Sequence, residues 1–269
     1  MNAQPTPHAL TATPDSCVGA ATRPTLIFLH GIGGRAHGWA PVMDACAHAG
    51  WPCLAWDMPG YGDSPWIDPY DFDGLSDALH ALLLAHGLGQ AVLVGHSMGG
   101  MVALQHWARH RADVKALVLV ASSPAFGNGS GDFQREFVAQ RLAPLEAGRT
   151  LADVAERIVP SMLAPGASAT AHAAAKACMG SIATETYRAS IHALVTFEQR
   201  AALPSITVPT LCVAAELDRT ASPSVVQRMA EKIPGASCVV MPGVNHLLTF
   251  EQPDAFARVV LDFVERSVK

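Results

Sequence analysis

The chain has 269 residues, enough for one large α/β domain or two small ones, and this length excludes a marginal mini-fold. Hydrophobic residues make up 50% of the chain and charged residues 15%, a balance that favours an extensive core over disorder. The net charge of −5 gives no basic surface for nucleic acid or anionic lipid. We therefore expect no nucleic-acid partner and no membrane partner.

Targeting signals and cysteine usage indicate the compartment. The N-terminal segment lacks the basic and apolar regions of a secretory signal, and the longest apolar runs fall short of the roughly 20 residues that span a bilayer. The cysteines are scattered and form no CxxC pair: Cys17, Cys46, Cys53, Cys178, Cys212 and Cys238. These features predict a cytoplasmic protein with reduced, buried thiols.

Short apolar runs rich in β-forming residues alternate with helical patterns along the chain. They occupy residues 25–29, 52–56, 91–94, 116–120, 210–214 and 237–241. The alternation predicts βα units and a parallel sheet. Because these runs are apolar throughout, we expect helices on both faces of the sheet.

Three of the helical patterns have recognisable ends. An apolar stripe runs from Leu75 to Leu83 at helical spacing and stops before Gly87, which suits the C′ position. Ser222 and Pro223 are typical of the N-cap and first turn of a helix running towards Ile233. Pro253 likewise opens a C-terminal helix.

The stretch from about residue 124 to residue 204 breaks this rhythm. It is helical and Ala-rich, has no convincing strand and is too long for an ordinary connection. We predict an inserted helical subdomain over 124–204, with 1–123 and 205–269 forming the core domain. Its large apolar residues can build its own core, which we favour, or line a ligand site: Phe133, Phe137, Met162, Met179 and Phe197.

The sharpest local signal is the sequence Gly95-His96-Ser97-Met98-Gly99, which follows an apolar strand and precedes a helical segment. This is G-x-S-x-G in the strand–turn–helix context that a serine nucleophile requires. Ser97 must lie on a tight turn, where Gly95, Gly99 and Gly100 leave room. The alternative, an incidental glycine-rich turn, is disfavoured by that context.

A serine nucleophile needs a base and an orienting acid, and chain position selects them. His246 lies beyond the last strand, and Asp218 follows the strand before it, so both belong to the carboxyl edge of the sheet. The order Ser97, Asp218, His246 matches the nucleophile, acid and base of α/β-hydrolases. Glu216 is a rival acid that lies closer to its strand.

Backbone N–H groups are the expected donors to a tetrahedral oxyanion. We predict that Met98, which follows the nucleophile, supplies one and that Ile32 in His30-Gly31-Ile32-Gly33-Gly34 supplies the other. This second loop lacks the G-x-G-x-x-G spacing of a dinucleotide fingerprint. We therefore expect no nucleotide cofactor.

Five segments resemble, in order and spacing, the α/β-hydrolase superfamily: LHGIGG, WDMPGYGDS, GHSMGG, the Asp218 loop and GVNHLLTFEQP. The resemblance covers about residues 24–123 and 205–266 and implies an α/β-hydrolase fold with the insertion as its cap. GHSMGG in particular is similar to 3-oxoadipate enol-lactonases and meta-cleavage-product hydrolases. These relatives use no metal or organic cofactor, and none is implied here.

The short segment before His30 leaves room only for short or incomplete versions of the antiparallel strands that open this fold. Within WDMPGYGDS the resemblance implies structural roles for Asp57, Gly60, Gly62 and Ser64. We expect His30 and His96, beside the site, to hold loops.

The leading hypothesis is a serine hydrolase that forms an acyl-enzyme on Ser97 from a small carboxylic ester or lactone. The alternatives are a C–C bond hydrolase of a diketone-like ring-cleavage product and a non-catalytic ligand receptor on the same fold. A helical lid would favour short acyl groups. An inward-facing arginine of the insertion could bind a substrate carboxylate: Arg135, Arg141, Arg149, Arg157, Arg188 or Arg200. The sequence leaves the oligomeric state open.

Overall fold

The computed structural model describes residues 9–12, 23–127 and 131–268, and within them one sheet orders its strands β1-β3-β2-β4-β5-β6-β7. The strands are β1 (Ala9–Ala12), β2 (Leu26–Leu29), β3 (Cys53–Trp56), β4 (Ala91–His96), β5 (Val114–Val120), β6 (Thr210–Ala215) and β7 (Ser237–Met241). Strand β1 runs antiparallel to β3, and the other neighbours are parallel. The predicted parallel sheet is confirmed, and a single short antiparallel strand opens it in the described residues.

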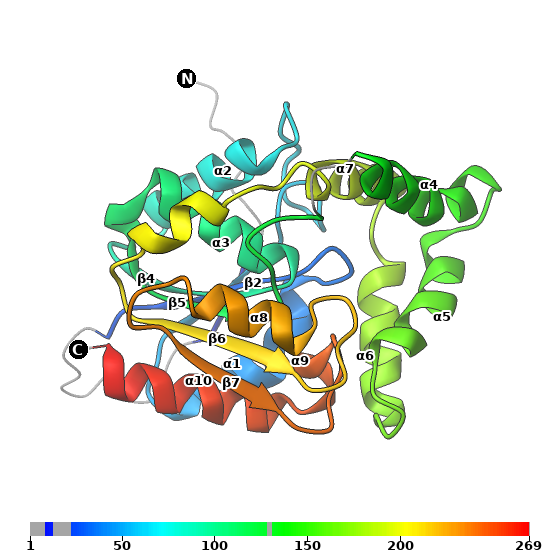
Figure 1. Cartoon of the computed structure of the whole chain (residues 1–269). Coiled ribbons are helices and arrows are strands. Elements are labelled where there is room, and N and C mark those ends of the chain that lie inside the picture. The colour runs from blue at the N-terminus through cyan, green and yellow to red at the C-terminus, as the bar shows by residue number, and fades with distance from the viewer. Residues whose placement is uncertain (1–8, 13–22, 128–130, 269) are drawn as a thin grey trace.

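Helices cover both faces of this sheet (Figure 1). One face packs against α2 (Phe72–Ala85), α3 (Met98–Arg109) and α8 (Pro223–Ala230), and the other packs against α1 (Ala40–His48) and α10 (Pro253–Ser267). The described short elements are η1 (Ala36–Trp39), η2 (Arg111–Asp113), η3 (Arg200–Ser205) and α9 (Leu248–Glu251). The sheet is therefore the central layer of three.

Strand β2 shows why the central strands are apolar throughout. Successive side chains of a strand point to opposite faces, so Ile27 joins the core under α2 and α3, whereas Phe28 joins the core under α1 and α10. Strand β7 differs, since it lies at the edge and only Met241 in it is buried. The expectation of burial on both faces is wrong for that strand.

The helix ends follow the predicted signals. Gly87 adopts a φ of 62° after α2, a left-handed conformation that favours glycine, and the Leu88 N–H donates to the Leu83 carbonyl at 2.9 Å. Pro253 and Pro223 open α10 and α8. Helix α8 ends at Ala230, and tighter turns continue to Ile233.

Between β5 and β6 the chain forms α4 (Asp132–Glu146), α5 (Leu151–Met162), α6 (Ala169–Gly180) and α7 (Thr184–Leu194). The described part of 124–204 has no strand, only an isolated bridge between Ala125 and Glu198. These helices lie beyond the end of the sheet to which the β6 and β7 arrows point (Figure 1). We call residues 124–204 the insertion, and its status as a separate domain remains a prediction.

The structure bears on two expectations from the composition, the absence of a membrane-spanning helix and the burial of the cysteines. No described helix is long and apolar enough to cross a bilayer. Cys46, Cys53, Cys178 and Cys212 are buried, but Cys238 is exposed because it lies on edge strand β7, so the prediction of buried thiols is wrong there. Cys17 lies outside the described residues.

Candidate active site

Ser97 occupies the turn between β4 and α3. Its φ of 52° and ψ of −118° are unusual for a residue with a side chain, and the turn is anchored on both sides of the Ser97 backbone. The Ser97 N–H donates to the Val120 carbonyl at 2.8 Å, and its carbonyl accepts from Ser122 Oγ at 2.8 Å. Neighbouring strand β5 therefore holds the turn in the conformation that separates the Ser97 side chain from the strand and the helix.

The glycines around Ser97 are required by close packing. A Cβ atom at Gly95 would overlap the Gly99 carbonyl, and one at Gly99 would overlap the Leu29 carbonyl. A Cβ atom at Gly100 would lie 2.6 Å from Ser122 Oγ. The prediction that these glycines make room for the turn is confirmed.

The structure brings Ser97, Asp218 and His246 together from the ends of β4, β6 and β7. His246 Nδ1 lies 2.8 Å from Asp218 Oδ2, and His246 Nε2 lies 3.1 Å from Ser97 Oγ. Glu216, the rival acid, instead accepts a hydrogen bond from the Gly243 N–H at 2.7 Å on the surface. The arrangement can move a proton from the serine to the imidazole while a carboxylate orients the ring.

Asp218 is held as a buried carboxylate. Its Oδ1 accepts hydrogen bonds from the N–H groups of Thr220 at 2.6 Å and Ala221 at 3.1 Å. Burial alone would raise the pKa of Asp218, but the hydrogen bonds from His246 and from the two amides together hold that pKa below its usual value. Asp218 is therefore ionised near neutral pH and fixes Nδ1 of His246 as the protonated nitrogen.

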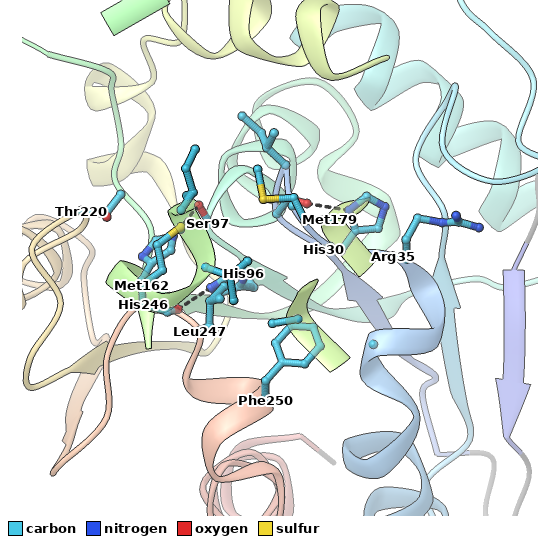
Figure 2. A pocket seen from close by; sticks show the side chains of 18 of the residues that line it. His30, Arg35, His96, Ser97, Met162, Met179, Thr220, His246, Leu247 and Phe250 are labelled. Atoms are coloured by element: carbon cyan, nitrogen blue, oxygen red, sulfur yellow. Dashed lines mark hydrogen bonds between the residues drawn. The ribbon is translucent and has the colours of Figure 1, made fainter. Parts of the chain in front are cut away.

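Two further histidines hold the loops, in agreement with the sequence-based expectation. His96 Nε2 donates to the His246 carbonyl at 2.8 Å, and His30 Nδ1 donates to the Gly31 carbonyl at 2.8 Å, both drawn as dashed lines in Figure 2. His30 Nε2 in turn accepts from the Met58 N–H at 3.1 Å. Burial lowers the pKa of His30 to about 4 and that of His96 to about 3, so both rings are neutral.

The His246 loop is tied to the insertion by residues that the sequence analysis did not identify. Glu251 accepts hydrogen bonds from the Asn245 N–H at 2.8 Å and from the Ala164 N–H at 2.9 Å. The Asn245 side chain donates to the Leu163 carbonyl at 3.2 Å. Because the partners in the insertion are more than 80 residues away in sequence, no local pattern marks these contacts.

The two predicted oxyanion donors come from the loop after β2, which carries Ile32, and from the first residue of α3, Met98. Among the described residues, no acceptor takes a hydrogen bond from the N–H of Ile32 or of Met98. A Cβ atom at Gly31 would lie 3.0 Å from Ser97 Cβ, so this loop passes directly against the serine. Tyr61 Oη, which the sequence analysis did not assign, donates to the Ile32 carbonyl at 3.0 Å and so holds the peptide that follows the predicted N–H donor.

Asp57 has the structural role that the resemblance implied. Its carboxylate binds Arg35 at 2.9 Å and 3.1 Å and accepts from the Ala36 N–H at 2.8 Å. Burial opposes its ionisation, but the hydrogen bonds from Arg35 and the Ala36 amide hold the pKa of Asp57 below its usual value. The pair fixes the end of the loop that carries Ile32, where η1 begins.

Ser97 opens into a cavity of about 100 Å³. One side, which we call the loop wall, is formed by strand-end loops and the α9 region: His30, Gly31, Ile32, Gly33, Gly34, Arg35, Gly38, Trp39, His96, Ser97, Thr220, His246, Leu247, Thr249 and Phe250. The other side, which we call the insertion wall, comes from α4 to α7: Phe137, Arg141, Ile158, Val159, Met162, Ala175, Met179, Tyr187, Ile191 and Leu194. Figure 2 shows Met162 and Met179 among the side chains that line the cavity with Ser97, His30 and His246.

The large apolar residues of the insertion divide between two roles. Phe137, Met162 and Met179 line the cavity, which is the alternative to the favoured core role, and Met179 belongs to the buried core as well. Phe197 packs against Phe72 with ring centroids 4.4 Å apart, as a core residue does, and Phe133 is 52% exposed. Sequence periodicity could not separate these roles, because a cavity wall and a core are both apolar.

In the described part of the chain, one group of side chains has the spacing of metal ligands. The candidate ligand atoms of His80, His110 and Asp113 lie within 4.8 Å of one another on the α2, α3 and η2 side of the sheet. The His80 and His110 rings stack, and His80 Nδ1 binds Asp113 at 2.6 Å. None of the three lines the Ser97 cavity, so this cluster has no part in the chemistry there.

The family model described as alpha/beta hydrolase fold matches residues 24–253. The chain belongs to this family. The match and the sheet confirm the predicted α/β-hydrolase fold and the prediction of a hydrolase.

Individual relatives add detail. A pimeloyl-[acyl-carrier protein] methyl ester esterase from Neisseria meningitidis serogroup C is 29% identical over 264 residues, which cover 88% of this chain and 92% of that protein. The solved enol-lactonase from Burkholderia xenovorans has a TM-score of 0.83 and 22% identity, over 96% of each chain. The esterase EaEST from Exiguobacterium antarcticum has a TM-score of 0.84 and 18% identity, over 96% of this chain and 95% of that one. At these identities the two solved structures show the shared fold.

Proposed function

We propose that the protein hydrolyses small carboxylic esters or lactones through an acyl-enzyme on Ser97. The observation that carries the proposal is the continuous contact from Asp218 through His246 to Ser97 Oγ, with separations of 2.8 Å and 3.1 Å, where Ser97 and His246 line a largely apolar cavity. The esterase relative from Neisseria meningitidis supports an ester as the substrate class.

The acylation half follows from the hydrogen-bond directions. His246 donates its Nδ1 proton to ionised Asp218, so its Nε2 has the lone pair that accepts the Ser97 proton. Ser97 Oγ attacks the substrate carbonyl carbon, and the resulting oxyanion binds the N–H groups of Ile32 and Met98. As the tetrahedral intermediate collapses, the imidazolium returns its proton to the leaving oxygen.

Deacylation repeats these steps with water. His246 removes a proton from the attacking water, and the second tetrahedral intermediate uses the same two N–H groups. Its collapse breaks the bond to Ser97 Oγ and gives back the serine proton through His246. The products are a carboxylic acid and an alcohol, or a hydroxy acid when the substrate is a lactone.

The insertion acts in this proposal as a cap. Its side chains form the insertion wall, and the contacts of Leu163 and Ala164 with the His246 loop fix its position relative to the catalytic side. A cap that excludes water strengthens the electrostatic contacts in the site and restricts the size of the acyl group.

The test is a turnover screen of the purified protein. The substrates are p-nitrophenyl acetate, butanoate and dodecanoate, an enol-lactone and a meta-cleavage diketone. We expect ester or lactone hydrolysis that is lost in Ser97→Ala by on the order of 10⁶-fold in kcat and retained in the control Ser224→Ala, whose side chain is exposed.

Two results would overturn the proposal in different ways. Cleavage of the diketone well above every ester would support the C–C bond hydrolase. Binding of these compounds without any turnover would support the receptor.

A further inference from the structure

Two arginine side chains line the Ser97 cavity, and their surroundings differ. Arg35, in the loop wall, makes a double hydrogen bond to Asp57. Arg141, in α4 of the insertion wall, lies with its Cζ atom 5.1 Å from the centre of the Phe137 ring. A guanidinium that stacks on an aromatic ring can still donate from the N–H groups at its rim.

The charge of Arg141 has no protein counter-ion among the described residues. No carboxylate oxygen of that part of the chain lies within 4.0 Å of its guanidinium nitrogens, whereas other insertion arginines are paired: Arg135 with Asp132, Arg188 with Glu146 and Arg200 with Glu198. Arg149 and Arg157 are exposed and do not line the cavity. Arg141 is therefore the insertion arginine that combines a cavity-facing position with an unpaired charge in the described structure.

The surroundings of Arg141 strengthen its attraction for an anion. The insertion wall is apolar apart from Arg141 and the Tyr187 hydroxyl, and a charge pair is stronger where water is scarce. Tyr187 is buried and neutral, because burial raises its pKa although the charge of Arg141 and its side-chain hydrogen bond to Tyr187 oppose that rise. The guanidinium fork matches the geometry of a carboxylate, with two parallel hydrogen bonds.

We infer that Arg141 binds a carboxylate of the substrate, separate from the reacting carbonyl, so that the preferred substrates are anionic esters or lactones such as half-esters of short dicarboxylic acids. This inference rests on the proposed hydrolysis at Ser97. Arg141 would select the substrate and would leave the chemistry to the loop wall.

The first test compares two esters that differ only in charge: monomethyl adipate and its neutral amide counterpart, methyl adipamate. We expect the unaltered protein to favour the anionic ester in kcat/KM by about 10- to 100-fold, the range for a hydrogen bond to a charged group. Arg141→Gln should reduce this ratio to near one, and Arg141→Lys should leave an intermediate ratio because it keeps the charge and loses the fork. The exposed control Arg157→Gln should keep the full ratio.

A second arm locates the carboxylate. 4-Acetoxybutanoate has its charge in the leaving group. If the protein prefers it over its amide, and if this preference depends on Arg141, then the carboxylate that Arg141 binds belongs to the leaving group and not to the acyl group. An unchanged ratio in Arg141→Gln for both substrate pairs, in a variant with an unaltered thermal unfolding midpoint, would overturn the inference and leave the ester hydrolase intact.

A binding measurement separates this inference from the proposed function. Calorimetric titration of Ser97→Ala with monomethyl adipate should give binding that Arg141→Gln in the same background weakens by about 10-fold or more. If the unaltered protein hydrolyses no ester but this difference is found, the proposed function fails and the carboxylate site stands. Equal affinities in the two proteins would contradict the carboxylate site.

Discussion

The two walls of the Ser97 cavity are built on different principles. In the loop wall, main-chain hydrogen bonds place each polar group, as when Val120 accepts from the Ser97 N–H and His96 binds the His246 carbonyl. In the insertion wall, packing of apolar side chains such as Met162 and Met179 sets the shape. Under the proposed function, the chemistry would therefore depend on backbone geometry, whereas substrate choice would depend on side chains that can change without moving the backbone.

Among the variants that test this comparison, the largest effect is expected behind the loop wall, at the carboxylate that binds His246. Asp218→Asn should lower kcat by about 10⁴-fold, because an amide cannot fix the His246 tautomer as a carboxylate does, while the far-UV circular dichroism stays unchanged. Glu216→Gln is the matched control, since Glu216 binds the Gly243 N–H and not the imidazole. If the Glu216 variant loses activity and the Asp218 variant keeps it, the acid assignment is wrong.

The next effect tests whether backbone packing sets the serine turn. Gly99→Ala would press a methyl group on the Leu29 carbonyl and should lower the free energy of unfolding by about 3 kcal/mol, the upper end for overpacking. Gly89→Ala is the control, because a Cβ atom there meets nothing within 4 Å. Urea unfolding of both variants provides the comparison, and equal stabilities would show that the turn tolerates movement.

Lowering the pH should reduce the free energy of unfolding through the buried histidines of the loop wall. The pKa values of His30 and His96, about 4 and about 3, lie below the ordinary 6.5, so the unfolded chain takes up protons first as the pH falls. The stability that these neutral histidines contribute is present above pH 6.5 and is lost as the pH falls from there to their pKa values in the folded protein. Between pH 7 and pH 5 the free energy of unfolding should fall by roughly 2 kcal/mol for each histidine. In His96→Gln the free energy of unfolding should decline less steeply over this pH range than in the unaltered protein. In His192→Gln, an exposed change in the insertion, the decline should be unchanged.

The smallest effect concerns the insertion wall. A cavity of about 100 Å³ leaves little room for a long acyl chain, so kcat/KM for p-nitrophenyl butanoate should exceed that for the dodecanoate by about 10-fold or more. Ile191→Ala, which enlarges the cavity at that wall, should reduce the difference in kcat/KM between the two esters. Faster turnover of the dodecanoate by the unaltered protein would refute a compact cavity and leave the loop-wall chemistry untouched.

The same contrast explains how far the sequence could predict the molecule. The Ser97 turn and the strand ends at Asp218 and His246 could be predicted from the sequence, because each is encoded by a short run of neighbouring residues. The carboxyl ends of parallel strands then gather at one edge. The fold class followed from the alternation of strands and helices in the same way.

Other features depend on contacts between distant segments. Glu251 binds Ala164 and Tyr61 binds Ile32, pairings that no local period encodes. From the sequence, Arg141 was only one of six candidate arginines in the insertion, because whether its side chain faces the cavity depends on how α4 packs. The exposure of Cys238 depends in turn on the edge position of β7.

The central claim is an acyl-enzyme on Ser97, and covalent trapping tests it most directly. The protein is treated with a fluorophosphonate that mimics the tetrahedral intermediate, and the mass of the intact protein and of its peptides is measured. We expect one adduct, on the peptide that contains Ser97, and none on Ser97→Ala. Ester turnover that persists without an adduct at Ser97, or an adduct on another residue that alone abolishes turnover, would contradict the account.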